Sequence, residues 1–125
     1  LMESDFVRLR EKATLGDVVS IIASARRNIF PVIDDFGHLI GIVQLDDLRE
    51  DMFKHEKWGN PITTYMIQPP DRILEKEQIQ EVLPRFEQNH TWMLPVVDKE
   101  NRYKGFISKS KILNAYREQL VNISQ

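Results

Sequence analysis

One short pattern occurs twice in this chain, and the repetition constrains the fold more than any other feature of the sequence. Residues 30–48 read FPVIDDFGHLIGIVQLDDL, and residues 94–112 read LPVVDKENRYKGFISKSKI, at an offset of 64 residues without a gap. Nine positions carry the same residue at this offset, among them Pro31 and Pro95. Because one spacing in two copies requires one local structure, the sequence indicates a tandem duplication.

Apolar spacing predicts a helix near the start of each copy. Both copies place apolar residues at positions i, i+3, i+4 and i+7 of one helix face. These residues are Leu15, Val18, Val19 and Ile22, and then Ile79, Val82, Leu83 and Phe86. Thr14 is the predicted N-cap of the first helix, with Asp17 three residues later, and Arg26 and Arg27 are expected at its C-terminal end. Pro84 is expected near the first turn of the second helix, where its missing N–H matters least.

Two apolar runs follow each helix and predict a pair of strands. In the first copy the runs cover residues 29–33 and 39–43. Gly37 in the connecting turn favours a positive φ, and Asn101 takes its place in the second copy. Pro31 and its counterpart lack a backbone N–H, so we expect both at a strand start or a sheet edge.

Each copy is therefore predicted to be a β-α-β-β-α unit, which makes the chain an α+β protein. Leu9 and Ile73 mark the short first strands, and the last helix of the first copy is expected to run from Leu45 to Met52 or Phe53. The last helix of the second copy is longer, with apolar positions Ile112, Leu113, Tyr116 and Leu120.

The predicted boundaries are 2–53 for the first repeat, 54–65 for a polar linker, 66–118 for the second repeat and 119–125 for a C-terminal tail. With 42% hydrophobic residues the chain has enough apolar surface for one ordinary core. Neither copy closes a core alone, so we expect the two to pack with pseudo-two-fold symmetry and to form a ligand cleft between them.

This pair of units, with Pro-Val and Asp in one strand and Gly in the next, resembles a CBS-domain pair, the Bateman module, over residues 2–118. The resemblance implies a regulatory module that binds adenine nucleotide between its repeats, forms a homodimer and controls an attached protein. Residues 108–117, SKSKILNAYR, are similar to the end of the cytoplasmic tail of bacterial CLC-type chloride channels. That similarity implies an attached transmembrane channel domain and a location on the cytoplasmic side of the inner membrane.

The resemblance also implies candidate nucleotide-binding residues. In the family, a Ser or Thr three residues after the conserved Gly binds phosphate, and an Asp or Asn three residues later binds ribose. The first copy keeps the carboxylate as Asp47 but has Gln44 in place of the hydroxyl, whereas the second copy keeps Ser108 but has Lys111 in place of the carboxylate. The first copy is therefore the better candidate for ATP, ADP or AMP. The remaining candidates flank these positions in the strands: Pro31, Ile42 and Pro95.

Each of these residues also has an interpretation without a ligand. Asp47 and its neighbour Asp46 stabilise a helix dipole, and Ser108 is a suitable N-cap. Lys111 is either a solvated side chain or a phosphate contact. We expect Trp58 and Trp92 in packing or in a dimer interface rather than stacked on a ligand.

Charge and composition exclude several other functions. A net charge of −2 argues against nucleic acid as the main partner, because binding to phosphates normally requires a basic face. The chain has no Cys, its three His lack partners at metal-binding spacing, and it carries no recognisable catalytic motif. We therefore expect no enzyme and no metal site. Two functions stay open: a nucleotide-sensing module, and a ligand-free dimerisation module of another transporter or a cytosolic enzyme.

Overall fold

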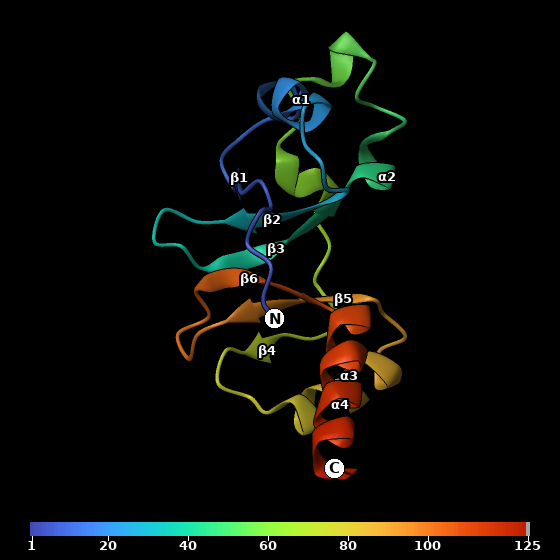
Figure 1. The fold of residues 1–125 in the computed structure, drawn as a ribbon. Helices are drawn as coiled ribbons and strands as arrows, with labels where there is room; N and C mark the ends of the chain where they lie inside the picture. Colours follow the sequence, from blue (N-terminus) through green and yellow to red (C-terminus); the bar gives the residue numbers. More distant parts are fainter. Residues whose placement is uncertain (125) are drawn as a thin grey trace.

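The computed structural model describes residues 1–124 and contains the same five-element unit twice (Figure 1). Repeat one consists of β1 (Leu9–Arg10), α1 (Leu15–Ala23), β2 (Ile29–Ile33), β3 (Leu39–Gln44) and α2 (Leu45–Leu48). Repeat two consists of β4 (Ile73–Leu74), α3 (Ile79–Gln88), β5 (Met93–Val97), β6 (Tyr103–Ser108) and α4 (Lys109–Ser124). Two 3₁₀ helices connect the repeats, η1 (His55–Lys57) and η2 (Ile62–Tyr65). The predicted α+β tandem fold is confirmed.

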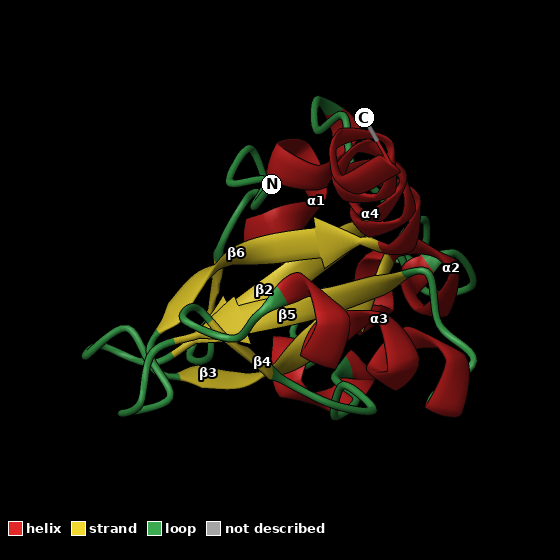
Figure 2. Ribbon diagram, turned by 60° about the horizontal axis from the view of Figure 1, so that its bottom comes forward, coloured by secondary structure: helices red, strands yellow, loops and turns green. Residues whose placement is uncertain are grey.

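The two sheets have one topology and one register. Their strand orders are β1-β2-β3 and β4-β5-β6, with a parallel outer strand and an antiparallel hairpin in each. Pro31 lies opposite Ile42 in the first hairpin, and Pro95 lies opposite Phe106 in the second. The strands form the centre of the molecule and the helices lie around them (Figure 2).

Three clusters of buried side chains hold this arrangement together. One lies within repeat one and one within repeat two, and each places helix residues against its own sheet. The third cluster combines both repeats and consists of Phe6, Leu39, Ile42, Val97, Tyr103 and Phe106. Because β3 and β6 both contribute to this cluster, each repeat covers an apolar sheet face that the other would leave exposed.

The segments that precede each repeat cross to the opposite sheet. Glu3 exchanges two backbone hydrogen bonds of 2.8 and 2.9 Å with Phe106 of β6, and Ile67 exchanges two of 2.8 and 2.9 Å with Ile42 of β3. The crossing explains why glycine occurs at the same place in both copies. A Cβ on Gly105 would lie 2.6 Å from the Glu3 carbonyl oxygen, and the equivalent atom on Gly41 would lie 2.5 Å from a Met66 carbon.

Several local predictions are confirmed. Thr14 and Asp17 form a capping box at the start of α1, in which each side chain accepts a hydrogen bond from the other residue's backbone N–H. Gly37 and Asn101 both adopt positive φ, +86° and +65°. The turn between the two long strands of each repeat therefore has the same backbone geometry although its residues differ.

The prediction for Pro84 was wrong, and the prediction for Pro31 holds only in part. Pro84 lies inside α3 rather than in its first turn, and it is exposed while Val82 and Phe86 are buried against the core. Burial of these two side chains keeps the helix continuous although Pro84 donates no hydrogen bond. Pro31 is the third residue of the central strand β2, and β1 pairs only with the two residues that follow it. One side of Pro31 therefore has no β1 residue in register with it.

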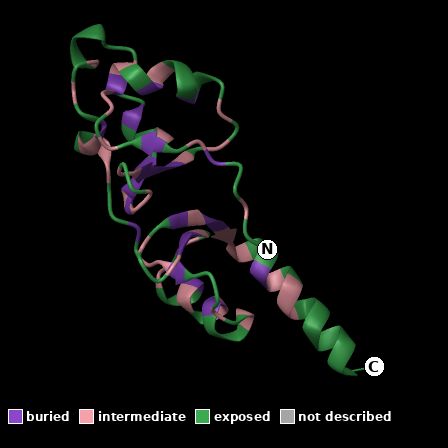
Figure 3. Ribbon diagram, turned by 90° about the vertical axis from the view of Figure 1, so that its left-hand side faces the viewer, coloured by how far each residue is buried: buried purple, intermediate pink, exposed green. Residues whose placement is uncertain are grey.

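Two helix ends also differ from the prediction. Helix α2 ends at Leu48 and does not reach Phe53, whose side chain is 79% exposed and so provides no burial to extend the helix. Helix α1 ends at Ala23, which places Arg27 beyond the helix. At the other end of the chain, α4 continues to Ser124 and projects from the body of the molecule (Figure 3).

Candidate ligand cleft between the repeats

A cavity of about 490 Å³ lies between the repeats. Its lining comes from both of them and from the two crossing segments: Phe6, Arg27, Asn28, Ile29, Ile42, Gln44, Asp46, Ile67, Pro70, Thr91, Trp92 and Met93. Repeat one supplies Ile42, Gln44 and Asp46 from the end of β3 and the start of α2. Their counterparts in repeat two do not line it, so the cavity belongs to the repeat-one side of the interface.

The structure brings only some of the predicted site residues together. Ile42 and Gln44 line the cavity. Asp47, the predicted ribose carboxylate, is exposed and does not line it, whereas the preceding residue Asp46 does. Pro31 and Pro95 are buried within their strands and do not line it. The remaining two predicted residues, Ser108 and Lys111, lie at the equivalent position in repeat two.

The helix that begins at this cavity lacks a side-chain cap. Gln44 is the N-cap residue of α2, and its side chain makes no capping hydrogen bond. Asp46 forms an exposed ion pair of 2.6 Å with Arg49. Asp46 therefore lines the cavity while paired with Arg49, and Asp47 beside it in the chain is exposed.

The corresponding helix start in repeat two is occupied by the chain's own groups. The Ser108 hydroxyl accepts a hydrogen bond of 3.2 Å from the backbone N–H of Lys111, which is N-cap geometry. The Lys111 ammonium lies 3.4 Å from a carboxylate oxygen of Glu3, from the crossing segment. The half-site in repeat two is thus an internal contact, consistent with the interpretation of Ser108 as a cap.

An aromatic side chain forms one wall of the cavity. Trp92 is 66% exposed, and the Lys109 ammonium lies 4.8 Å from the centre of its ring. Lys109 also pairs with Glu87 at 2.9 Å. A large exposed ring held beside a cation offers a stacking surface for a planar ligand.

A guanidinium forms another wall. Arg27 donates hydrogen bonds of 2.7 Å to Glu3 and of 2.7 and 3.2 Å to the two carboxylate oxygens of Asp5. It also lies 4.5 Å from the centre of the Phe6 ring. Hydrogen bonding to Arg27 holds the pKa of Glu3 and of Asp5 below the usual range.

The comparison with known proteins agrees with this architecture. The family model for the CBS domain matches residues 1–54 and 62–118. The chain belongs to the CBS-domain family. The match covers two copies, so the molecule is a CBS pair, and the resemblance inferred from the sequence is confirmed at this level.

Parts of longer proteins are similar to the chain in sequence. Inosine-5'-monophosphate dehydrogenase of Aquifex aeolicus is 29% identical over 127 residues, which cover 91% of this chain but 24% of that enzyme. The chain therefore spans about a quarter of the length of this relative, and 43% of the uncharacterized protein MJ0188 of Methanocaldococcus jannaschii.

Solved structures show the same fold. The CBS domains of a transcriptional regulator from Streptococcus pneumoniae align with a TM-score of 0.75 at 21% identity, over 91% of this chain and 93% of that one. The cytosolic domain of the Mg²⁺ channel MgtE in complex with ATP aligns with a TM-score of 0.77 at 23% identity, over 92% of this chain and 46% of that one.

Sequence reasoning missed two residues that line the cavity, Arg27 and Trp92. Arg27 was assigned to a helix end, and Trp92 was expected in packing or in a dimer interface. Both precede a hairpin strand of their repeat, Arg27 by two residues and Trp92 by one. A position just before the first hairpin strand could have identified both residues as candidates from the sequence, because β2 and β5 both begin at the cavity.

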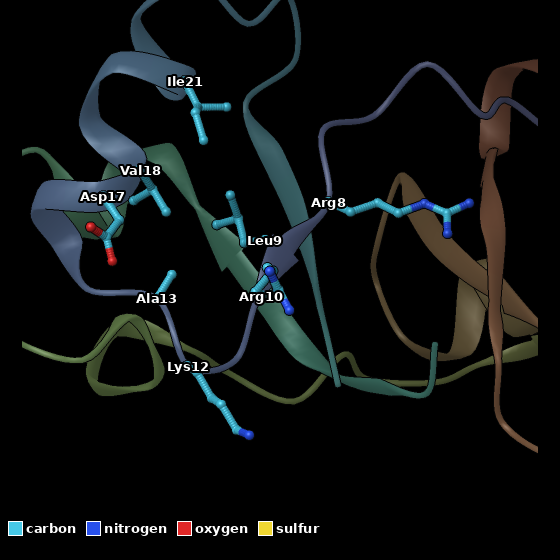
Figure 4. A pocket seen from close by; sticks show the side chains of 8 residues that line it. All are labelled: Arg8, Leu9, Arg10, Lys12, Ala13, Asp17, Val18 and Ile21. Carbon is cyan, nitrogen blue, oxygen red and sulfur yellow. The ribbon is translucent and has the colours of Figure 1, made fainter. Parts of the chain in front are cut away.

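A second hollow, of about 530 Å³, lies on the outer side of repeat one (Figure 4). Leu9, Ala13, Val18 and Ile21 surround it, while the Arg8 side chain points away toward repeat two. The charges at its rim are already engaged, because Arg10 and Lys12 lie 3.4 and 3.3 Å from Asp35, and Asp17 caps α1. All the lining residues of this hollow lie between Arg8 and Ile21, whereas residues of both repeats line the inter-repeat cavity, which is therefore the stronger candidate for a ligand that acts on their arrangement.

Two further properties bear on function. Within residues 1–124, no helix is both long and apolar enough to cross a membrane. In the same residues, His, Asp and Glu side chains form no group of three suited to hold a metal ion.

Proposed function

We propose that this CBS pair is a non-catalytic regulatory module of a larger protein and that it binds one adenine nucleotide in the inter-repeat cavity. The observation that carries the proposal is the cavity itself, which combines an exposed Trp92, the Arg27 guanidinium and the Asp46 carboxylate at a helix start, with Asp47 next to Asp46 in the chain. A purine would stack on Trp92, the ribose hydroxyls would donate to Asp46 or Asp47, and the phosphates would lie toward Arg27.

The known structures support this choice of ligand. Structures of the MgtE cytosolic domain and of the CBS domain of a bacterial CNNM/CorC Mg²⁺ transporter were solved with ATP. Because a ligand that contacts both repeats stabilises one mutual arrangement, nucleotide binding would change how the module acts on its attached partner.

A membrane transport protein is our proposal for that partner. The similarity of residues 108–117 to the tails of bacterial CLC-type chloride channels supports a chloride channel. The Mg²⁺ channel and transporter among the structural relatives support a transport protein more generally, with this module on the cytoplasmic side of the membrane. A soluble host such as an inosine-5'-monophosphate dehydrogenase is the alternative.

Thermal unfolding with millimolar ATP, ADP, AMP or adenosine tests the binding. ATP is expected to raise the midpoint, since a ligand present at about 100 times its Kd adds about 2.7 kcal/mol to the stability of the folded state. Replacing Trp92 by Ala is expected to reduce the rise, and comparing Asp46→Asn with Asp47→Ala identifies the ribose contact. Glu50→Gln, at an exposed carboxylate of the same region that does not line the cavity, is the matched control and should bind normally.

A second function, dimerisation without a ligand, is favoured by the exposed apolar side chains near the end of α4. Leu120, Val121 and Ile123 are all more than half exposed. Sedimentation of the chain at micromolar concentration separates the two functions. A dimer that no nucleotide stabilises would support dimerisation alone, and a monomer that nucleotide stabilises would support sensing alone.

A further inference from the structure

Arg27 occupies a position in the cleft that its present partners do not explain fully. It is the cation among the described residues that line the inter-repeat cavity. Its side chain is 30% exposed, and the Phe6 ring, which also lines the cavity, packs against its guanidinium. If Arg27 served only to hold the crossing segment against repeat one, its guanidinium would not need to line the cavity.

The carboxylates that bind Arg27 surround its guanidinium as the oxygens of a bound phosphate would. Asp5 accepts two hydrogen bonds from it, through both carboxylate oxygens, and Glu3 accepts a third. A guanidinium binds phosphate in the same paired geometry with which it binds a carboxylate. Glu3 and Asp5 therefore fill the positions that phosphate oxygens would take.

We propose that Arg27 is the phosphate-binding residue of the cavity and that Glu3 and Asp5 of the crossing segment occupy it until a phosphate displaces them. This inference rests on the proposed nucleotide function and adds to it a route by which binding is sensed. When the phosphate takes Arg27, the crossing segment loses these ion pairs and keeps the backbone bridge from Glu3 to Phe106 and the exposed contact with Lys111.

The other crossing segment has no such device. The counterparts of Glu3, Asp5 and Arg27 at the 64-residue offset are Ile67, Pro69 and Thr91. These residues form no ion pair, so a phosphate in the cavity acts on the segment before repeat one and leaves the segment before repeat two in place. Phosphate binding is thus expected to change the segment before repeat one and not the segment before repeat two.

Competition of this kind is reciprocal. If phosphate binding releases the crossing segment, then removing the two carboxylates must strengthen phosphate binding by the same coupling. The variant Glu3→Gln/Asp5→Asn keeps both side-chain shapes and removes both negative charges. We expect it to bind ATP several-fold more tightly, whereas a purely structural role for these residues predicts equal or weaker binding.

Isothermal titration and hydrogen exchange of backbone amides 3–7 on the whole chain test the inference. The probes are ATP, inorganic tripolyphosphate and adenosine. ATP and tripolyphosphate are expected to increase exchange at residues 3–7, and adenosine is expected to bind without doing so. Arg27→Ala should bind ATP about tenfold more weakly, from the loss of charge-assisted hydrogen bonds. Arg26→Ala, at the exposed neighbouring residue, is the matched control.

The outcomes separate this inference from the function on which it rests. ATP binding that leaves exchange at residues 3–7 unchanged, or that weakens in Glu3→Gln/Asp5→Asn, overturns the inference and leaves nucleotide binding intact. Failure of both ATP and tripolyphosphate to bind overturns both. If Arg27→Ala lowers the thermal midpoint so far that it cannot be titrated, Arg27→Lys, which keeps the charge without the paired geometry, gives the same comparison.

Discussion

The two repeats have the same backbone and nearly the same core, but they differ in the outer groove beside the first strand and first helix of each repeat. The side chains that line this groove are of different chemical types in the two repeats. Val18 and Val82 are equally buried in the two repeats, as are Leu9 and Ile73. In contrast, the position filled by Ile21 in repeat one is filled by Arg85 in repeat two. Duplicated units can therefore diverge in side-chain chemistry wherever the shared core does not fix the side chain.

Arg85 closes the groove of repeat two with an ion cluster. It donates two hydrogen bonds of 2.7 Å to Asp71, one of 2.6 Å to the Arg72 carbonyl oxygen and others to Glu77. In repeat one, Val7 and Ala13 stand at the positions of Asp71 and Glu77, so the carboxylates that bind Arg85 in repeat two are replaced by apolar side chains, and Ile21 is 42% exposed. The same comparison applies at the cleft, where Asp47 of repeat one corresponds to Lys111 of repeat two.

The largest expected effect comes from replacing Arg85 by Ala. Two partly buried carboxylates would lose their counter-charge, which costs about 2–3 kcal/mol of the free energy of unfolding. Ile21→Ala at the matching position should cost less than about 1 kcal/mol, because the side chain is already half exposed. Urea denaturation measures both, and equal losses would show that the ion cluster adds nothing to repeat two.

The pH dependence of stability provides an independent readout of the same cluster. The Arg85 guanidinium holds the pKa of Asp71 below its usual value near 3.8. Burial is the largest influence on Glu77 and by itself would raise its pKa, but the hydrogen bonds from Arg85 and from the backbone N–H of Leu74, together with the charge of Arg85, lower the pKa overall. A lowered carboxyl pKa stabilises the fold above the unfolded-state pKa, and this contribution is lost as pH falls through the lowered value. The difference between wild type and Arg85→Ala should therefore be constant near pH 7 and shrink below about pH 4.

The next largest effect concerns the crossing segments, where the repeats are alike. Gly105→Ala would place a Cβ 2.6 Å from the Glu3 carbonyl oxygen, and Gly41→Ala would place one 2.5 Å from a Met66 carbon and 2.9 Å from the Ile67 carbonyl oxygen. Each is expected to cost about 2 kcal/mol, as overpacking typically does, with the larger loss for Gly105 because its Cβ would lie closer to a backbone oxygen, which moves aside less readily than a flexible side chain. Thermal unfolding measures both. Gly59→Ala is the control, because its Cβ would meet no atom within 4 Å, and a loss there equal to the others would contradict the crossing geometry.

The smallest expected effect lies at the helix starts. Ser108→Ala should remove the cap of α4 and cost about 1 kcal/mol. Gln44→Ser should add the missing cap to α2, gain up to about 1 kcal/mol and restore the hydroxyl of the family pattern in the cavity. Chemical denaturation measures the change in stability of both variants, and titration of Gln44→Ser with ATP measures the effect of the restored hydroxyl. Stability that is unchanged in both variants would mean that the two helix starts do not differ in capping.

Much of the fold could be predicted because the repeated positions are the ones that local rules describe. The apolar stripe from Leu15 to Ile22 predicted α1, and Thr14 with Asp17 predicted its start. The positive φ of Gly37 and Asn101 followed from their residue types. Pro84 was misplaced because the local cost of proline in a helix is smaller than the gain from burying Val82 and Phe86 beside it.

The site was predicted less well than the fold. Gln44 and Ile42 line the cavity as expected, but the family pattern by itself did not show that Glu3 pairs with Lys111 or that Arg27 faces the cleft. Glu3 lies more than 100 residues from Lys111 in the chain. No local rule of sequence connects positions so far apart.

The sequence by itself determined the duplicated unit, its two hairpins and the need for the copies to share a core, because spacing, turn residues and apolar content are properties of short segments. Only the tertiary structure decided which half of the interface holds an open cavity. That outcome depends on where the crossing segments place the charges of Glu3 and Asp5, and those charges meet Arg27 and Lys111 only after both repeats have packed together.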